Sequence, residues 1–454
     1  MRKTSRIPSY LNDFHCIASE CRDNCCIGWD VDIDKATYAK YETLEDEELL
    51  ARTKKYIYKN KDAFNDNIDY ACVKLLSQKR CAFLNNKNLC MLQAKMGEEY
   101  LSNVCATYPR LINEIDGVTE YSATVSCEEA ARLILLNQAG FQLKTMPSSQ
   151  NDRSILTYKV NTRKKGQIMM VTYLNELREF TMAVLKKREY SLEERMLILK
   201  GFYLELDTMN YGKNVSKIKP LIERYIEELN KPGKCIKTQN NSTIIKSAYG
   251  GSKDLKIDIS AENPNIKITL ILEFLGELEV FKEIDSKSFV ELAREFLKGL
   301  DLVENDLVFA RKKVGIQSGN NSLKRESGSR EDSHKKAFLK YAVAQNNYYE
   351  PFMKKHEYIL ENYLVNYVYG NLFPASESER PRDAFMMLAI RFFIIKTMLI
   401  GISGNSKGMS PEMLVSFIQS FSKAIEHHKT FLEDLLAMAK KIKAVNQDMG
   451  ILIL

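Results

Sequence analysis

The sequence lacks the features that would carry it into or across a membrane. Its first 16 residues, MRKTSRIPSYLNDFHC, are basic and contain no apolar stretch of the kind found in a secretory signal. The best candidate for a membrane span, residues 384–402, is interrupted by Arg391 and Lys396, and each charge would cost about 2.5–3.5 kcal/mol at the centre of a bilayer. We therefore expect a cytoplasmic protein with no membrane partner. We expect residues 384–402 to form a buried helix whose two basic residues lie at an exposed edge or pair with acids.

Charge of one sign is not concentrated in any part of the chain. The net charge is +7 over 454 residues, and lysine and arginine are spread along the whole sequence. Short runs at residues 163–165 and 311–313 are typical of solvated turns, whereas a nucleic-acid-binding protein needs a basic cluster on one face. The sequence therefore predicts no nucleic-acid partner, and its charge is compatible with an acidic protein partner.

Cysteine is nearly absent from the last 327 residues, which contain only Cys235. The other nine of the ten cysteines lie between residues 16 and 127. Eight of them form the pattern Cys16-x4-Cys21-x3-Cys25-Cys26 and Cys81-x8-Cys90-x14-Cys105-x21-Cys127. Thiols concentrated in this way indicate the ligand set of a metal centre.

Three kinds of bond could explain these cysteines. Disulfides are disfavoured because nothing in the sequence directs it to an oxidising compartment. Structural zinc could occupy two sites of four thiolates, but zinc ligands usually lie two to four residues apart, and only residues 21–26 approach this spacing. An iron–sulfur cluster tolerates irregular spacing, and it suits the adjacent Cys25 and Cys26 if one of them reaches a different iron. The spacing favours a cluster, with zinc as the alternative, and eight thiols imply either bystanders or two sites.

The rest of the chain is mainly helical by its apolar periodicity. The periodicity covers most of residues 167–229 and 336–445. Another helix is expected from residue 128, directly after Cys127, because carboxylates occupy its first turn. A thiol at a helix N-terminus has a lowered pKa, which suits a thiolate ligand. We expect a mainly α fold.

Composition divides the chain into two predicted domains. We expect a cysteine-rich metal-binding module at residues 1–140, packed on a mainly helical domain at residues 141–454. Alternating stretches within residues 234–274 predict a small β insertion. Residues 315–333 are almost without apolar side chains and predict an exposed loop.

The chain resembles the flagellin lysine-N-methylase (FliB) family in its cysteine segments, FHCIASECRDNCCIGWDVDID, CAFLNNKNLCMLQAKMG, LSNVCATYPRL and TVSCEEAARLIL. The resemblance extends to LENYLVNYVYGNLFP at residues 360–374 and to FIQSFSKAIEHHKTFL near the C-terminus, so it covers most of the chain. The N-terminal part alone also resembles the wider YkgJ-type cysteine-cluster proteins, which are described as zinc or iron chelators.

The resemblance implies an enzyme that transfers a methyl group from S-adenosylmethionine to the ε-amine of surface lysines of flagellin. It also implies an iron–sulfur cluster, which we expect to be of the 4Fe–4S type. The family's cysteine pattern falls on Cys16, Cys21, Cys25, Cys26, Cys81, Cys90, Cys105 and Cys127. Cys72 and Cys235 lie outside the pattern and are expected to be structural thiols in the core.

A few further residues could contact the implied cofactor. Aromatic faces attract a sulfonium or ammonium group, which makes Tyr108, Trp29, Tyr363 and Tyr367 candidates, with core packing as the alternative role. Arg110 could bind the carboxylate of the cofactor's methionine moiety, or it could form a salt bridge within the fold. We take Tyr108 and Arg110 as the predicted cofactor-binding residues.

Two signatures common among enzymes that use this cofactor are missing. No glycine-rich turn stands between a strong strand and a helix, and Gly401, Gly404 and Gly408 are expected to end a helix instead. The three-cysteine motif CxxxCxxC is also absent, because Cys21-x3-Cys25 continues with Cys26. The sequence therefore assigns no catalytic residue. A non-enzymatic zinc- or iron-binding interaction protein is the alternative function.

Overall fold

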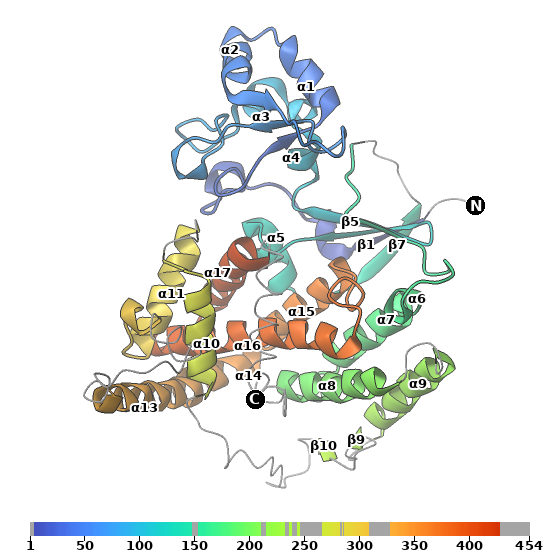
Figure 1. Ribbon diagram of the computed structural model, residues 1–454, viewed down its shortest axis with the longest axis vertical. Coiled ribbons are helices and arrows are strands. Elements are labelled where there is room, and N and C mark those ends of the chain that lie inside the picture. Colours follow the sequence, from blue (N-terminus) through green and yellow to red (C-terminus); the bar gives the residue numbers. More distant parts are fainter. Residues whose placement is uncertain are drawn as a thin grey trace, which may run out of the picture. The chain divides into compact units, whose positions relative to one another are not determined.

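The computed structural model divides the chain into two compact units, an N-terminal unit (Met1–Arg163) and a C-terminal unit (Lys164–Leu454). It describes residues 4–147, 153–209, 215–231, 236–237, 243–245, 266–281, 284, 286–307 and 327–426. Helices dominate these residues, as the periodicity predicts (Figure 1).

Two small sheets belong to the N-terminal unit. Their strands are β1 (Thr4–Pro8), β2 (Asp32–Ile33), β3 (Ile57–Lys59), β4 (Ala71–Val73), β5 (Arg110–Ile115), β6 (Val118–Ala123), β7 (Leu143–Pro147) and β8 (Tyr158–Val160). Five strands pair in the order β7-β1-β6-β5-β8, in which β1 with β6 and β5 with β8 are parallel and the other pairs are antiparallel. The other three form the antiparallel sheet β2-β4-β3.

The five-stranded sheet was not predicted from the sequence, although one of its hairpins has a clear signal. Strands β5 and β6 are antiparallel neighbours and are joined by Asp116 and Gly117 alone. Both turn residues have positive φ, 51° and 85°, as the type I′ turn of a two-residue hairpin requires. The Asp-Gly pair between two short alternating segments is therefore a signal from which this hairpin could have been predicted.

Five helices complete the N-terminal unit. They are α1 (Lys35–Glu42), α2 (Glu47–Tyr56), α3 (Met91–Met96), α4 (Asn103–Thr107) and α5 (Glu128–Leu135). Carboxylates cap the first two, since Asp34 accepts a hydrogen bond from the Thr37 N–H at 2.9 Å and Asp46 accepts one from the Leu49 N–H at 2.8 Å. Figure 1 shows α1 to α4 gathered at one end of this unit, with β1, β5 and β7 at the other.

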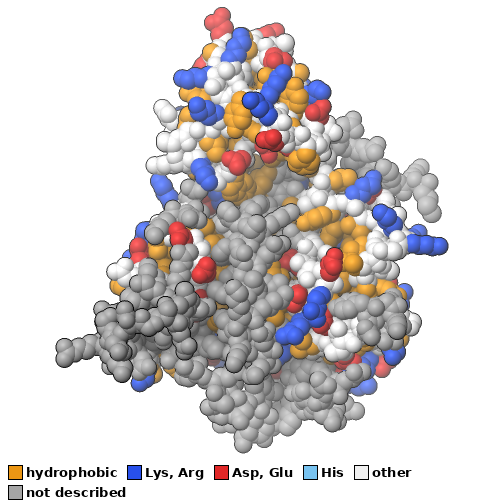
Figure 2. Space-filling model, in the orientation of Figure 1, with side chains coloured by type: hydrophobic (Ala, Val, Ile, Leu, Met, Phe, Trp, Pro, Cys, Tyr) orange, Lys and Arg blue, Asp and Glu red, His pale blue; other side chains and the backbone are white. Residues whose placement is uncertain are grey.

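The surface charge is mixed, as expected from the even spread of lysine and arginine. Figure 2 shows basic and acidic side chains interspersed over the visible described residues. Many form exposed ion pairs, such as Lys35 with Asp66 at 2.8 Å and Lys95 with Glu48 at 2.7 Å. Exposed pairs of this kind contribute about 0–1 kcal/mol each, so they add little to stability.

The C-terminal unit is a helical body. Its helices are α6 (Met169–Thr172), α7 (Leu174–Leu185), α8 (Leu192–Thr208), α9 (Ile218–Leu229), α10 (Ile266–Glu277), α11 (Lys287–Gly299), α13 (Ser327–Ala344), α14 (Glu350–His356), α15 (Tyr358–Gly370), α16 (Pro381–Ser406) and α17 (Pro411–Phe421). Helix α16 packs against α8, α11, α13 and α17. In the part of the chain that the structure describes, it alone is long and apolar enough to cross a membrane, and its apolar window is completely buried. It is the core helix of this unit.

Arg391 and Lys396, the two basic residues near the middle of α16, are buried and paired, which confirms one of the two predicted arrangements. Arg391 Nη1 lies 3.1 Å from a carboxylate oxygen of Glu377, and Lys396 Nζ lies 3.0 Å from one of Glu193. A buried charge whose partner is removed costs several kcal/mol. Glu377 and Glu193 therefore stabilise the core helix by neutralising its two buried basic residues.

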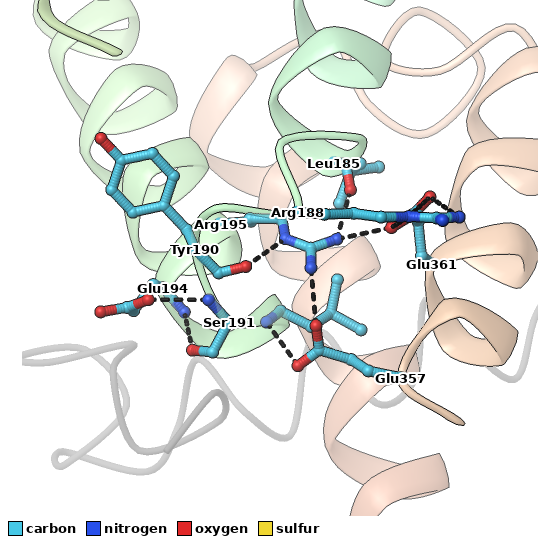
Figure 3. A network of polar contacts seen from close by, with 9 residues as sticks. Leu185, Arg188, Tyr190, Ser191, Glu194, Arg195, Glu357 and Glu361 are labelled. Carbon is cyan, nitrogen blue, oxygen red and sulfur yellow. Dashed lines mark hydrogen bonds and ion pairs between the residues drawn. The ribbon is translucent and has the colours of Figure 1, made fainter. Parts of the chain in front are cut away.

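A larger network joins α8 to the helices on either side of residue 357 (Figure 3). The Arg195 guanidinium, 2% exposed, donates to the carboxylates of Glu361 at 2.8 Å and Glu357 at 2.6 Å. It also donates to the carbonyls of Leu185 at 2.7 Å and Tyr190 at 2.8 Å. Because each of the three guanidinium nitrogens donates to at least one oxygen, the positive charge of Arg195 is tolerated inside the helical body.

Glycine allows α11 and α16 to approach closely. A Cβ placed on Gly299 would lie 1.9 Å from the carbonyl oxygen of Gly401 and 3.0 Å from the Asn405 nitrogen. The prediction that Gly401 and Gly404 end the helix was wrong, since both lie within α16, which continues to Ser406. Their role is to let the backbones of two helices touch.

Two predictions between residues 234 and 333 need correction. Strands β9 (Ile236–Lys237) and β10 (Thr243–Ile245) pair antiparallel, as the predicted β insertion requires. Residues from 266 onward are helix α10 instead, because a largely apolar segment of 12 residues suits a buried helix better than a strand. Helix α13 begins at Ser327, so the predicted exposed loop does not reach residue 333. Residues 246–265 and 308–326 lie outside the described residues.

The contact between α11 and α16 gives a test of this packing. We expect Gly299→Ala to reduce the free energy of unfolding by more than about 2 kcal/mol, because the new methyl group meets backbone atoms that cannot rotate away. Urea unfolding of the full chain, followed by circular dichroism, measures the change.

Gly408→Ala is the matched control. No atom lies within 4 Å of a Cβ at this position, so we expect a change within about 1 kcal/mol. Equal stability of the two variants would show that the helices do not depend on the glycine contact.

Candidate metal centre

A cavity of about 540 Å³ in the N-terminal unit has a wall rich in sulfur. All eight cysteines of the predicted ligand pattern line it: Cys16, Cys21, Cys25, Cys26, Cys81, Cys90, Cys105 and Cys127. Cys72 is not in the lining, and its Sγ lies 3.2 Å from Asp32 Oδ1 as a hydrogen-bond donor. Cys235 lies outside the described residues. The fold thus brings the predicted thiols together and separates them from Cys72.

The first four cysteines lie on the loop between β1 and β2. The side chains of Asn24 and Arg22 attach this loop to later segments of the chain. The Asn24 side chain accepts a hydrogen bond from the Cys26 N–H at 2.7 Å and donates one to the carbonyl of Asn88 at 2.8 Å. Farther back, the backbone N–H and Nε of Arg22 each donate to the Glu128 carboxylate at 2.7 Å. The loop is therefore anchored to two later segments of the chain, each carrying cavity cysteines.

The other four cysteines lie on a loop and at the starts of short helices. The Cys81 N–H donates to the carbonyl of Cys26 at 2.9 Å. Cys90 is the N-cap residue of α3, and Cys127 is the N-cap residue of α5. Cys105 is in the first turn of α4. The backbone amides of Leu92 and Gln93 hydrogen-bond to the Cys90 sulfur, and those of Glu129 and Ala130 hydrogen-bond to the Cys127 sulfur, which stabilises negative charge on both.

Burial controls the protonation of these thiols. It raises the pKa of Cys21 and of Cys105 to about 12. It raises the pKa of Cys81 and of Cys127 to about 11. Thiols with such values are neutral near pH 7 unless a bound cation compensates for the lost water.

The expectation of a lowered pKa at Cys127 was wrong in sign. Backbone amides of Ala130 and Glu129 hydrogen-bond to the sulfur and lower its pKa, as a helix N-terminus should. Burial has the larger effect and leaves the pKa raised. Sequence position reveals the helix start but not the loss of water around the sulfur.

The donor set fits a thiolate-binding metal group. Sulfur ligands select soft metals such as zinc, copper(I) and the iron of iron–sulfur clusters. Among the residues that the structure describes, no three His, Cys, Asp or Glu side chains converge closely enough to hold one ion. The eight thiols are spread over the wall of one cavity. Which metal binds stays a prediction.

Aromatic and basic side chains form another part of the cavity wall. The rings of Trp29 and Tyr108 meet edge to face with centroids 5.3 Å apart, and the Tyr108 hydroxyl lies 3.1 Å from Ser126 Oγ. The Arg110 guanidinium lies 5.3 Å from the ring centroid of Phe14. No carboxylate of the described residues lies within ion-pair distance of Arg110, so the alternative of a salt bridge is not realised there. Both predicted cofactor-binding residues thus share the cavity with the thiols.

The other two aromatic candidates belong to the C-terminal unit. The Tyr363 hydroxyl donates to Glu426 at 2.6 Å, and the Tyr367 hydroxyl donates to Glu377. Both rings are buried, and the Arg391 guanidinium lies 4.2 Å from the Tyr367 ring centroid. These tyrosines are core residues of their unit and do not line the thiol cavity.

A second cavity of about 390 Å³ adjoins this part of the N-terminal unit. It shares Glu98, Ala106 and Arg110 with the thiol cavity and is also lined by Arg153 and Tyr121. Arg153 is held in place because it donates to the backbone carbonyls of Leu101 and Glu98. Sequence analysis missed Glu98 and Arg153, which stand in no recognisable motif.

A known protein family matches more than half of the chain. The family described as the FliB lysine N-methylase C-terminal domain matches residues 178–454. The likeness of the N-terminal part to YkgJ-type proteins stays a prediction.

The curated relatives are similar over a shorter stretch. A lysine-N-methylase of Salmonella choleraesuis (strain SC-B67) and one of Salmonella typhimurium (strain LT2) are each 30% identical over 129 residues, 28% of this chain and 31% of the relative. The flagellar biosynthetic protein FliU of Salmonella muenchen is 30% identical over 129 residues, 28% of this chain and 75% of the relative. The chain thus spans about a third of the length of the two methylases. No solved structure matches.

The raised pKa values predict how metal affinity depends on pH. Each thiol that becomes a ligand must lose a proton, and values of about 11 to 12 keep the metal-free thiols protonated throughout the neutral range. We therefore expect the apparent affinity for Co²⁺ or Zn²⁺ to rise between pH 6.5 and 8.5, by about tenfold per unit for each proton released. Competition with a chromophoric chelator under anaerobic conditions measures it. An affinity that is constant over this range would contradict thiolate ligation.

Proposed function

This chain belongs to the FliB lysine N-methylase family, and from that membership we propose that it transfers a methyl group from S-adenosylmethionine to surface lysines of flagellin. The family match over residues 178–454 carries the proposal. The names of two relatives, lysine-N-methylase and flagellar biosynthetic protein, support the reaction and the substrate. We place the reaction in the cytoplasm, where thiols stay reduced.

We further propose that S-adenosylmethionine binds beside the thiol cavity. Arg110 is suited to the carboxylate of the methionine moiety, because its guanidinium has no ion pair with any carboxylate that the structure describes and can offer two parallel donors. The faces and edges of Trp29 and Tyr108 lie on the same wall and can stabilise the positive charge of the sulfonium. Cofactor binding would thus combine one charge-assisted contact with an aromatic surface.

The transfer itself sets a requirement on the substrate lysine. Its nitrogen lone pair must form a bond to the methyl carbon while the bond from that carbon to sulfur breaks, which leaves S-adenosylhomocysteine. The lysine must be neutral at that moment, although its ordinary pKa is about 10.4. A desolvated channel lowers that pKa, since burial disfavours the ammonium form.

The cavity thiols are proposed to hold the metal centre of this enzyme. The chemistry of the donor set and its spread around the cavity fit an iron–sulfur cluster, with zinc as the alternative. A bound cluster would supply iron that can accept a ligand or an electron. The residues of the chain contribute the sulfur atoms and the backbone amides that hydrogen-bond to them.

Cofactor binding is the first test. We expect the anaerobically purified full chain to bind both S-adenosylmethionine and S-adenosylhomocysteine in calorimetric titrations. Arg110→Ala should weaken binding about ten- to hundredfold, since a hydrogen bond to a charged group contributes about 1.5–3 kcal/mol. Arg163→Ala, at an exposed position outside both cavities, is the control and should bind like the wild type.

Two outcomes would count against this proposal. If neither ligand binds the wild type, the non-enzymatic metal-binding alternative is favoured. If both variants bind equally well, Arg110 does not contact the cofactor.

Substrate modification is the second test. Incubation with S-adenosylmethionine and flagellin from the same organism should add mass to flagellin in steps of about 14 Da at lysines, the increment of a methyl group replacing hydrogen. Intact-mass and peptide mass spectrometry measure the steps and locate them. Unchanged flagellin, with cofactor binding confirmed, would remove flagellin as the substrate and leave the methyltransferase assignment standing.

A further inference from the structure

We infer that the second cavity receives the side chain of the substrate lysine and that Glu98 binds its ammonium group. The inference rests on the proposed function and deepens it, because it assigns the place of the lysine. The second cavity, of about 390 Å³, shares Glu98, Ala106 and Arg110 with the thiol cavity. A group bound in one cavity can therefore lie beside a group bound in the other, as direct transfer of a methyl group requires.

One face of the five-stranded sheet lines the second cavity. Arg110 and Ile112 are two residues apart on β5, so their side chains leave the same face of the sheet. Ile112 is directly opposite Tyr121 of β6, which places Tyr121 on that face as well. Ile7 of β1 also lines this cavity. Of these four residues only Arg110 lines the thiol cavity too, so it marks the end of the surface at which the two cavities adjoin.

This surface suits both parts of a lysine side chain. Ile7, Leu11 and Ile112 offer apolar atoms against which the four methylene groups can pack. Long basic side chains commonly lie on apolar surface in this way while the charged head reaches water or a partner. The Tyr121 ring can add a favourable contact with an ammonium group.

Glu98 supplies the negative charge of the second cavity. Among the described residues that line this cavity, it is the one acid, and Arg110 and Arg153 are the basic residues. No basic side chain that the structure describes forms an ion pair with the Glu98 carboxylate. Glu98 is also exposed, so a lysine on the surface of another protein can reach it. A carboxylate in this position is available for a charge-assisted hydrogen bond from an incoming ammonium group.

Arg153 holds the backbone of Glu98 in place. Its guanidinium donates to the backbone carbonyl of Glu98 at 3.2 Å and to that of Leu101. Its Nε donates to the Asn103 side chain at 3.5 Å. The short turn Glu98–Tyr100 is therefore tied to the later segment that carries Arg153. The fold thus fixes where the Glu98 side chain begins.

The charges around the lysine favour capture first and loss of its proton afterwards. Glu98 attracts the ammonium form as the lysine enters. That form is disfavoured by the Arg153 guanidinium in the same cavity and by the positive charge of the cofactor. The proton passes to water at the exposed side of the cavity. The nitrogen lone pair then forms the bond to the methyl carbon while the bond from that carbon to sulfur breaks.

Binding of a small lysine probe tests the inference without turnover or flagellin. Nα-acetyl-lysine amide and its norleucine analogue, which lacks the ammonium group, are titrated into the anaerobically purified full chain and followed by ligand-observed NMR. The titrations are made with and without S-adenosylhomocysteine. The wild type should prefer the lysine probe. Glu98→Gln should weaken binding of the lysine probe about three- to tenfold and leave the norleucine probe unchanged, because only a charged partner is removed.

Glu99→Gln is the matched control. Glu99 is the next residue of the same turn and is also exposed, but it lines neither cavity. This variant should bind the lysine probe like the wild type. Equal weakening in both variants would show that the net charge of the surface causes the effect and would overturn the role of Glu98. Unchanged binding in Glu98→Gln would overturn it as well.

Ser154→Phe tests the path of the lysine. Ser154 lines the second cavity but not the thiol cavity, so a phenyl ring at this position should occupy part of the second cavity alone. Circular dichroism verifies that the variant is folded. We expect it to lose binding of the lysine probe and to bind S-adenosylhomocysteine like the wild type. Loss of S-adenosylhomocysteine binding with the lysine probe still bound would show that the second cavity holds the cofactor, which would overturn the inference.

The outcomes separate this inference from the proposed function. If S-adenosylhomocysteine does not bind the wild type, the proposed reaction fails, while titrations of the lysine probe alone still decide the role of Glu98. If flagellin is not modified but binding of the lysine probe depends on Glu98, the lysine site stands and the substrate protein is a different one. If S-adenosylhomocysteine binds and the wild type does not prefer lysine to norleucine, the inference is overturned and the proposed reaction stands.

Discussion

The loss of water around sulfur is the constraint on which the N-terminal unit depends. Cys105 and Cys21 have a pKa of about 12 because burial disfavours the thiolate, and the hydrogen bonds from the Ser102 side chain to Cys105 and from the Asp23 backbone to Cys21 offset only part of this. The apolar cluster beneath them is small and includes three of the cysteines themselves. A bound cation would remove the electrostatic cost and tie several loops together at once, so metal binding and folding of this unit should be coupled.

The C-terminal unit also buries charged groups, but it stabilises them without a metal ion. Its buried charges are paired at contact distance, as Arg195 is with Glu361 and Arg391 with Glu377, and need no added ion. The family match begins at residue 178, within this unit, whereas every cavity thiol precedes residue 128. The family match therefore lies in the C-terminal unit, whose buried charges are paired within the chain, whereas the cavity thiols lie in the N-terminal unit.

Features that depend on local pattern could be predicted from the sequence. Periodicity gave α8, α9 and the buried α16, and spacing singled out the eight cysteines that line one cavity. The β5–β6 hairpin was missed although Asp116-Gly117 signals it, and α10 was mistaken for a strand because a short apolar run suits both. Features that depend on distant contacts could not be predicted. Burial at Cys127 reverses the effect of its helix, and only the folded chain shows that Arg22 meets Glu128.

The pair of Arg22 and Glu128 also imposes an order in time on the growing chain. The two residues are 106 positions apart, so at about 5–20 residues per second a ribosome needs roughly 5–20 seconds to supply the second after the first. During that interval the earliest cysteines are outside the ribosome without the segment that later holds them. Until then the Cys21 thiol lacks part of the surroundings that bury it in the folded chain, so a reducing environment protects it while the chain is being made.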